Sequence, residues 1–205
     1  MKILITIIFV SLAGHAASQN DIQKCAKKKN EAVLKSLGTK PDSSAKQEYV
    51  QLDQEWQQCI VGKPVPFFHA NGLNNEEINS EKLKGKIIVA NFWFTSCPPC
   101  IAEMPALNRL VSEFKDKGVV FLAFTFEDKK DLKKFLVNHQ LDFKIIPGAQ
   151  SVSNLFGVLE YPTNFVIDQN GKVAMAFVGG ETEEEAKTSA YLKIKPVLES
   201  LLKKQ

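Results

Sequence analysis

Two successive segments near the start of the chain carry apolar residues at the three- and four-residue steps of a helix. The first covers residues 21–37 and is followed by Gly38, a residue type that commonly ends a helix. The second covers residues 44–60, in which Ser44 and Gln47 have the spacing of a capping box. The pattern predicts an antiparallel helical hairpin. Its apolar positions are Ile22, Ala26, Val33 and Leu37 in the first segment and Ala45, Tyr49, Leu52, Trp56 and Ile60 in the second.

The rest of the chain alternates between strand and helix patterns, beginning after a linker at residues 62–66 that is rich in Gly and Pro. Nearly continuous apolar runs at 87–94 and 119–126 are typical of strands covered on both faces. Further on, the pair Asn170-Gly171 is a strong signal for a β-hairpin. The remaining predicted elements are helices 98–117, 129–139 and 151–156 and strands 163–168 and 172–178.

A last helix is expected after Thr182, which has Glu185 at the spacing of a second capping box. Pro196 lies inside this helix and is expected to kink or split it. A β-α-β opening, a β-hairpin and a closing helix together predict an α/β fold. In such a fold a central mixed sheet has helices on both faces.

The first residues have the layout of a secretory signal peptide. Lys2 supplies a positive charge, residues 3–13 are almost wholly apolar, and small residues follow at 16–18. The apolar run is shorter than the roughly 20 residues of a spanning helix, although an uncleaved N-terminal anchor remains the alternative. We therefore expect an exported protein, periplasmic or otherwise extracytoplasmic. The predicted organisation is a signal peptide at 1–18, a helical hairpin at 19–62 and the α/β domain at 63–205.

Composition and charge narrow the function classes. The 205 residues are 44% hydrophobic and 24% charged, which excludes a disordered chain and a multi-pass membrane protein. The formal net charge is only +3 and Arg109 is the single arginine, so no nucleic-acid partner is expected. His69 and His139 stand alone in the sequence. We expect no metal site and no small-molecule cofactor.

The spacing of Cys25 and Cys59 suggests a structural disulfide. Their midpoint is residue 42, inside the expected turn of the hairpin. Each cysteine is then about 25 Å from the turn along its helix, so the two lie side by side. Stable disulfides are allowed outside the cytosol. The alternative is two free, partly buried cysteines.

Cys97 and Cys100 form a C-x-x-C motif where the first strand gives way to a helix. A cysteine at a helix N-terminus is close to the positive end of the helix dipole, which favours the thiolate. Pro98 and Pro99 are tolerated in a first helical turn but remove two N–H donors. Fewer donors to the thiolate favour a reducing couple, roughly −270 mV rather than −120 mV.

Two stretches resemble the thioredoxin-like TlpA/ResA group of extracytoplasmic thiol-disulfide oxidoreductases. The first is GKIIVANFWFTSCPPCIAEMP at 85–105, and the second is FGVLEYPTNFVID at 156–168. The similarity covers about residues 63–180 and leaves the hairpin outside. It implies a thioredoxin fold for the α/β domain and the reduction of disulfides in exported proteins. It also implies a membrane electron donor of the DsbD/CcdA kind as a partner.

The resemblance implies roles for matching residues. Cys97 would be the exposed attacking thiolate, and Cys100 the buried thiol that resolves the mixed disulfide. Pro162 matches a cis-proline opposite the motif, and Tyr161 would present its backbone to an extended substrate. Pro105 matches the kink proline of the active-site helix.

Glu103 is the candidate acid–base group. It lies three residues after Cys100, on the same helical face, where a carboxylate could take the Cys100 proton. Thioredoxins place a buried Asp six residues before the first cysteine, and here that position is Asn91, which cannot titrate. The resemblance suggests that Glu103 takes this role. The alternative is an ordinary surface glutamate.

Three other functions remain open. A thiol peroxidase of the peroxiredoxin type would have Thr three residues before its reactive cysteine, where this chain has Phe94. A copper-binding module of the Sco type would have C-x-x-x-C and a distant His, which the spacing of Cys97 and Cys100 does not match. An interaction protein could retain the scaffold without the chemistry, but the intact motif with Glu103 and Pro162 argues against it.

Overall fold

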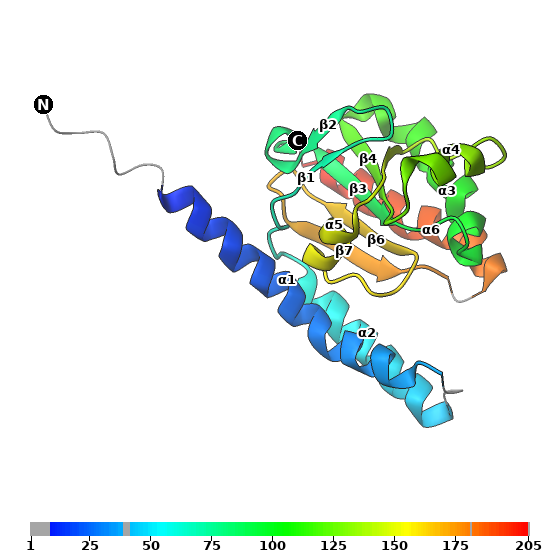
Figure 1. Ribbon diagram of the computed structural model, residues 1–205. Helices are drawn as coiled ribbons and strands as arrows, with labels where there is room; N and C mark the ends of the chain where they lie inside the picture. Colours follow the sequence, from blue (N-terminus) through cyan, green and yellow to red (C-terminus); the bar gives the residue numbers. More distant parts are fainter. Residues whose placement is uncertain (1–8, 39–41, 181, 205) are drawn as a thin grey trace, which may run out of the picture.

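The computed structural model describes residues 9–38, 42–180 and 182–204. Residues 1–8 of the expected signal peptide lie outside the described residues. Helix α1 (Phe9–Ser36) packs against helix α2 (Ser43–Ile60) as an antiparallel hairpin, and its N-terminal end projects beyond the rest of the molecule (Figure 1). Within the described part of the chain, no helix is both long and apolar enough to span a bilayer.

A five-stranded mixed sheet forms the centre of the remaining chain, with strand order β5-β4-β3-β6-β7. Strands β3, β4 and β5 run parallel, whereas β6 is antiparallel to β3 and β7 is antiparallel to β6. Every residue of the central strand β3 is buried, which explains its unbroken apolar sequence. The strands are β3 (Ile87–Phe92), β4 (Val119–Phe124), β5 (Lys144–Ile146), β6 (Thr163–Ile167) and β7 (Val173–Val178).

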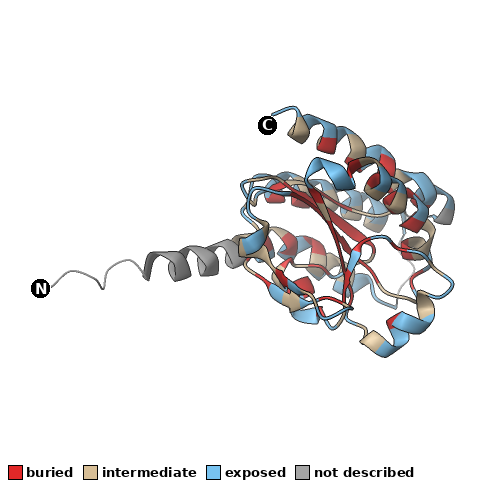
Figure 2. Ribbon diagram, turned by 90° about the horizontal axis from the view of Figure 1, so that it is seen from above, coloured by how far each residue is buried: buried red, intermediate tan, exposed pale blue. Residues whose placement is uncertain are grey.

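Helices cover both faces of this sheet, and each face has its own hydrophobic cluster. Helix α3 (Pro98–Phe114) packs against helix α6 (Glu183–Leu202) on one face, and α4 (Lys129–Phe135) adds Leu132 to the same cluster. The hairpin and helix α5 (Gln150–Leu155) lie on the other face. Buried residues line the sheet and the inner helix surfaces (Figure 2). The predicted α/β fold with an N-terminal helical hairpin is confirmed.

The inner half of the hairpin contributes to the core of the sheet. Ile22 and Ala26 of α1 and Trp56 and Ile60 of α2 are all buried in the second cluster. The Trp56 ring meets the Phe165 ring of β6 edge to face, with centroids 6.1 Å apart. The outer half extends past the sheet, as the lower end of the two helices shows (Figure 1).

One prediction about a helix end is wrong, and one about a helix break is narrowed. The N-cap of α2 is Asp42, whose carboxylate accepts from the Ala45 N–H at 2.8 Å, and Ser44 only donates to Asp42. Helix α6 is not split at Pro196, and a kink there stays a prediction. The proline removes the hydrogen bond to the Leu192 carbonyl, and that residue is exposed, so water can satisfy it.

Other differences concern short elements. Helix α3 ends earlier than predicted and continues as a single 3-10 turn, η2 (Lys115–Lys117), and α4 stops at Phe135. Strand β5 and the small antiparallel pair β1–β2 were not predicted, because three residues are too few for a periodic pattern. The capping box of Thr182 and Glu185 is confirmed. The additional elements are β1 (His69–Asn71), β2 (Glu77–Asn79) and η1 (Ser80–Leu83).

Candidate active site

The two cysteines of the C-x-x-C motif are held at the start of α3. Cys97 is the N-cap residue, and its sulfur accepts the Cys100 N–H at 3.3 Å. Pro98 and Pro99 occupy the first two helical positions, where missing N–H groups cost no helical hydrogen bond. The two cysteines form a disulfide with Cα atoms 5.3 Å apart, so the structure represents the oxidised form.

Both sulfur-bearing residues are buried in this form. Cys97 is 4% exposed and Cys100 is 1% exposed, so the expectation that Cys97 is exposed is wrong for the oxidised protein. The physical reason is the position of the motif in the hydrophobic core. Both cysteines belong to the cluster between the sheet and α3, and the half-buried rings of Phe94 and Tyr161 pack against that cluster.

Glu103 is fully buried among polar side chains from the two central strands. Asn91 of β3 donates to one carboxylate oxygen at 2.6 Å, and Asn164 of β6 donates to the other at 3.2 Å. Asn91 also donates to the Asn164 side-chain oxygen at 3.0 Å, which closes a ring of three residues. We call this group the Glu103 ring. Burial raises the pKa of Glu103 to about 8, against the lowering effect of the hydrogen bonds from Asn164 and Asn91.

The Tyr161–Pro162 peptide bond is cis, the isomer that the resemblance implies. The Gly179 N–H donates to the Pro162 carbonyl at 2.8 Å. A Cβ atom at Gly179 would be 2.4 Å from Pro162 Cγ and 3.3 Å from a Glu103 oxygen. The missing side chain at Gly179 therefore lets the proline loop and the Glu103 carboxylate lie next to each other.

Sequence reasoning missed several residues that support this site. Asn164 completes the Glu103 ring, and a polar residue inside the buried strand β6 was a usable signal for it. Glu127 accepts hydrogen bonds from both the main-chain N–H and the hydroxyl of Thr95, two residues before Cys97. That contact spans 32 residues of sequence, so no local pattern predicts it.

The second pair of cysteines lies in the hairpin, away from the Glu103 ring. Cys25 of α1 and Cys59 of α2 form a disulfide with Cα atoms 5.6 Å apart. The two histidines expected to be ordinary polar residues also have local partners. His69 lies 3.2 Å from Glu77, and the His139 ring stacks on Phe135. Among the residues the structure describes, no group of three or more His, Cys, Asp or Glu side chains could hold a metal ion.

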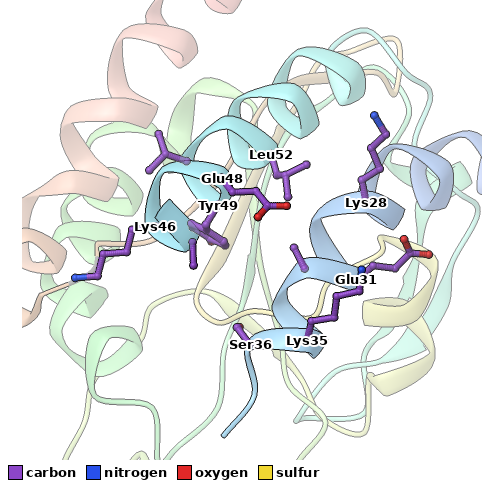
Figure 3. A pocket seen from close by; sticks show the side chains of 11 residues that line it. Lys28, Glu31, Lys35, Ser36, Lys46, Glu48, Tyr49 and Leu52 are labelled. Atoms are coloured by element: carbon purple, nitrogen blue, oxygen red, sulfur yellow. The ribbon is translucent and has the colours of Figure 1, made fainter. Parts of the chain in front are cut away.

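A hollow of about 840 Å³ lies between the outer halves of α1 and α2 (Figure 3). Residues of the hairpin alone line it, including Lys28, Glu31, Lys35, Tyr49 and Leu52. Neither C-x-x-C cysteine nor the Glu103 ring reaches it. The candidate active site at the start of α3 is therefore separate from this hollow.

Comparison with known proteins shows the family. The model of the AhpC/TSA family matches residues 61–176. The thiol-disulfide oxidoreductase ResA of Bacillus thuringiensis (strain Al Hakam) is 38% identical over 136 residues, which cover 65% of this chain and 77% of that protein. The thioredoxin-like protein YneN of Bacillus subtilis (strain 168) is 34% identical over 127 residues, which cover 60% and 75% of the two chains.

Solved structures give the same fold. A Chlorobium tepidum protein assigned as the thiol:disulfide interchange protein DsbE superposes with a TM-score of 0.61 at 25% identity, covering 69% of this chain and 97% of that one. The thioredoxin domain of a thiol-disulfide oxidoreductase from Bacteroides vulgatus superposes with a TM-score of 0.56 at 21% identity, covering 66% and 96%. The chain thus has a thioredoxin fold, belongs to the AhpC/TSA family and is a thiol-disulfide oxidoreductase of the ResA type.

Proposed function

We propose that this oxidoreductase works outside the cytoplasm and reduces disulfide bonds in exported proteins. The observation that carries the proposal is the Cys97–Cys100 disulfide at a helix N-terminus, with the buried Glu103 and the Tyr161–Pro162 loop beside it. The export pattern of the first 18 residues and the Cys25–Cys59 disulfide support the compartment, because such bonds persist where the surroundings are oxidising.

The first step is attack by Cys97 of the reduced protein. Its thiolate sulfur forms a bond to one sulfur of a substrate disulfide held beside Tyr161 and Pro162. The substrate S–S bond breaks, and the other substrate sulfur leaves as a thiolate that takes a proton from water. The N-cap position favours the attacking thiolate through the helix dipole and the Cys100 N–H.

The second step is release by Cys100. Its thiol gives a proton to the Glu103 carboxylate, and the sulfur attacks Cys97. The Cys97–Cys100 bond forms, the mixed disulfide breaks, and the second substrate sulfur leaves as a thiolate. The substrate gains two electrons and the cysteine pair loses two. Burial raises the pKa of Glu103 to about 8, which makes its carboxylate a stronger base for this proton than an ordinary exposed glutamate.

The oxidised pair must then be reduced by a dithiol donor. A membrane electron donor of the DsbD/CcdA kind, suggested by the family resemblance, would supply the two electrons. The reducing direction is favoured by Pro98 and Pro99, which remove two N–H donors that would otherwise stabilise the Cys97 thiolate.

A peroxidase reaction is the competing use of the same thiol. The family description includes AhpC, but the hydroxyl of Thr95 bonds to Glu127, and Phe94 occupies the position where a peroxiredoxin has Thr. Peroxide consumption by the reduced protein separates the two functions. We expect protein disulfides to react and hydrogen peroxide to be consumed no faster than by free cysteine.

Trapping tests the proposal directly. Cys100→Ser stops the second step, so exported substrates should accumulate as mixed disulfides on Cys97 that dithiothreitol releases. The double variant Cys97→Ser/Cys100→Ser is the matched control and should capture nothing. Absence of covalent partners in the single variant, or equal capture by the control, would contradict the proposed reaction. N-terminal sequencing of the mature protein tests cleavage near Ser18.

A further inference from the structure

The hairpin holds the segment that leads into Tyr161. The Gln23 side chain donates to the Asn154 carbonyl at 3.2 Å, and the Asn30 side chain donates to the Gly157 carbonyl at 3.0 Å. At Gly157 the approach is so close that an added Cβ would lie 2.7 Å from the Ala26 methyl group. Helix α1 therefore contacts residues 154–157, the segment that leads to the Tyr161–Pro162 loop.

Lys29 is a buried cation within this contact. Its side chain is only 5% exposed, and its Nζ lies 2.9 Å from an Asp53 oxygen and 3.0 Å from a Glu160 oxygen. The same Nζ lies 4.2 Å from the centroid of the Trp56 ring, within cation–π distance. Removing one member of a buried ion cluster leaves the others without compensation, so the cluster fixes its partners in place.

Glu160 is the member that belongs to the α/β domain. Lys29 faces one carboxylate oxygen, and the Tyr49 hydroxyl donates to the other at 2.6 Å, so both oxygens are bound by the hairpin. The Glu160 carbonyl accepts the Thr163 hydroxyl at 2.7 Å. The side-chain contacts fix Glu160, the residue before Tyr161, and the carbonyl contact joins Glu160 to Thr163, the residue after Pro162. The substrate would lie against Tyr161 and Pro162, between these two residues.

We propose that Lys29 is a positioning residue for the substrate-binding loop, and that it acts through Glu160. The side chain of Lys29 fixes Glu160 from the hairpin, and Glu160 fixes the direction in which the Tyr161 backbone faces the substrate. The inference rests on the proposed function, since it assigns the hairpin a part in binding a protein disulfide. Lys29 lies over Trp56, which belongs to the cluster on one face of the sheet, whereas the C-x-x-C cysteines belong to the cluster on the other face. We therefore expect it to leave their chemistry unchanged.

Kinetics of Lys29→Met with two substrates test the proposal. Insulin must lie along the Tyr161–Pro162 loop, whereas glutathione disulfide is too small to depend on the whole loop. We expect KM for insulin to rise about tenfold, with kcat and the rate with glutathione disulfide within about twofold of wild type. Lys28→Met is the matched control, because the neighbouring Lys28 side chain is 80% exposed and its ion pair with Glu55 is long, at 3.8 Å. It should leave both reactions unchanged.

Two further variants keep the test decisive if Lys29→Met folds poorly. Tyr49→Phe removes only the hydroxyl that Glu160 accepts and should raise KM for insulin two- to threefold. Glu160→Gln should raise it about as much as Lys29→Met, and the double variant Lys29→Met/Glu160→Gln should be no worse than either single one. Additive losses in the double variant would overturn the route through Glu160.

Hydrogen exchange separates this proposal from the proposed function. The Tyr161 amide should exchange at least tenfold faster in Lys29→Met and at the wild-type rate in Lys28→Met. Unchanged exchange, or equal slowing with insulin and glutathione disulfide, would overturn the role of Lys29. A wild-type protein that does not reduce insulin would overturn the proposed function instead, and the amide exchange would still decide whether Lys29 orders the loop.

Discussion

The two disulfides have similar dimensions and opposite surroundings. Their Cα separations are 5.6 Å for Cys25–Cys59 and 5.3 Å for Cys97–Cys100. Cys59 is exposed at the C-terminal end of α2, whereas Cys97 is buried at the N-terminal end of α3. The helix dipole disfavours a thiolate at the C-terminal end, where Cys59 lies, and favours a thiolate at the N-terminal end, where Cys97 lies. Position in the helix, rather than exposure, therefore separates the structural pair from the reactive one.

The two pairs also differ in their neighbouring groups and in the length of chain that each closes into a loop. The motif cysteines share a helix with Glu103, whose proton can move between a carboxylate and a sulfur. The hairpin pair joins two helices over 34 residues of sequence, while the motif pair spans only 3. Only the long loop removes much entropy from the unfolded chain. We expect one pair to control activity and the other to control stability.

The strongest test of the comparison is to remove Cys97. We expect Cys97→Ser to lower the rate of insulin reduction by at least about 1000-fold, because no nucleophile then exists at the helix N-terminus. The measurement is turnover with dithiothreitol as donor. The variant Cys25→Ser/Cys59→Ser is the control and should retain activity within about threefold at a temperature where it is folded. Comparable losses in both variants would refute the division of roles.

Glu103→Gln should change the pH dependence of stability. Burial raises the pKa of Glu103 from 4.5 to about 8, so the folded oxidised protein holds a proton that the unfolded chain has lost. The free energy of unfolding should therefore fall as pH rises from about 4.5 to about 8, by about 5 kcal/mol at 1.36 kcal/mol per pKa unit. Urea unfolding at several pH values measures this, and Glu103→Gln should remove the decline. A wild-type curve without it would place the Glu103 pKa near its ordinary value.

Removing the hairpin disulfide should destabilise the fold. For a closed loop of 34 residues, the entropic model gives about 3–4 kcal/mol for the loss of the bond. Urea unfolding of Cys25→Ser/Cys59→Ser against wild type measures the difference. Reducing the Cys97–Cys100 bond, which closes a much shorter loop, should have a smaller effect.

The smallest effect is expected at the loop before Cys97. Glu127 accepts two hydrogen bonds from Thr95, and Glu127→Gln weakens both by removing the negative charge. We expect a loss of about 1 kcal/mol in the free energy of unfolding and a modest decrease in turnover. Asp128→Asn, which changes the adjacent helix cap of α4 by the same chemical step, controls for charge.

The sequence predicted what depends on regular geometry. Helical rise and a turn at residue 42 placed Cys25 beside Cys59, and the alternation of strands and helices gave the mixed sheet. It could not show features that depend on tertiary contact. The burial of Cys97 comes from its place in a hydrophobic cluster that includes residues from 87 to 198. Asn91 and Glu160 find partners 73 and 131 residues away. The N-cap role of Asp42 was missed because Ser44 and Gln47 have the spacing of a capping box, which is a stronger local signal than a single aspartate.

Tyr161 packs against both hydrophobic clusters, one on each face of the sheet. Its neighbours attach it to both sides as well, through Pro162 next to Glu103 and through Glu160 next to Lys29. Thermodynamic linkage makes such a connection reciprocal. If the hairpin orders this loop for a substrate, then a bound substrate must stabilise the hairpin by the same free energy. The helices that look most remote from the sulfur chemistry would thus report, through their own melting, whether the site is occupied.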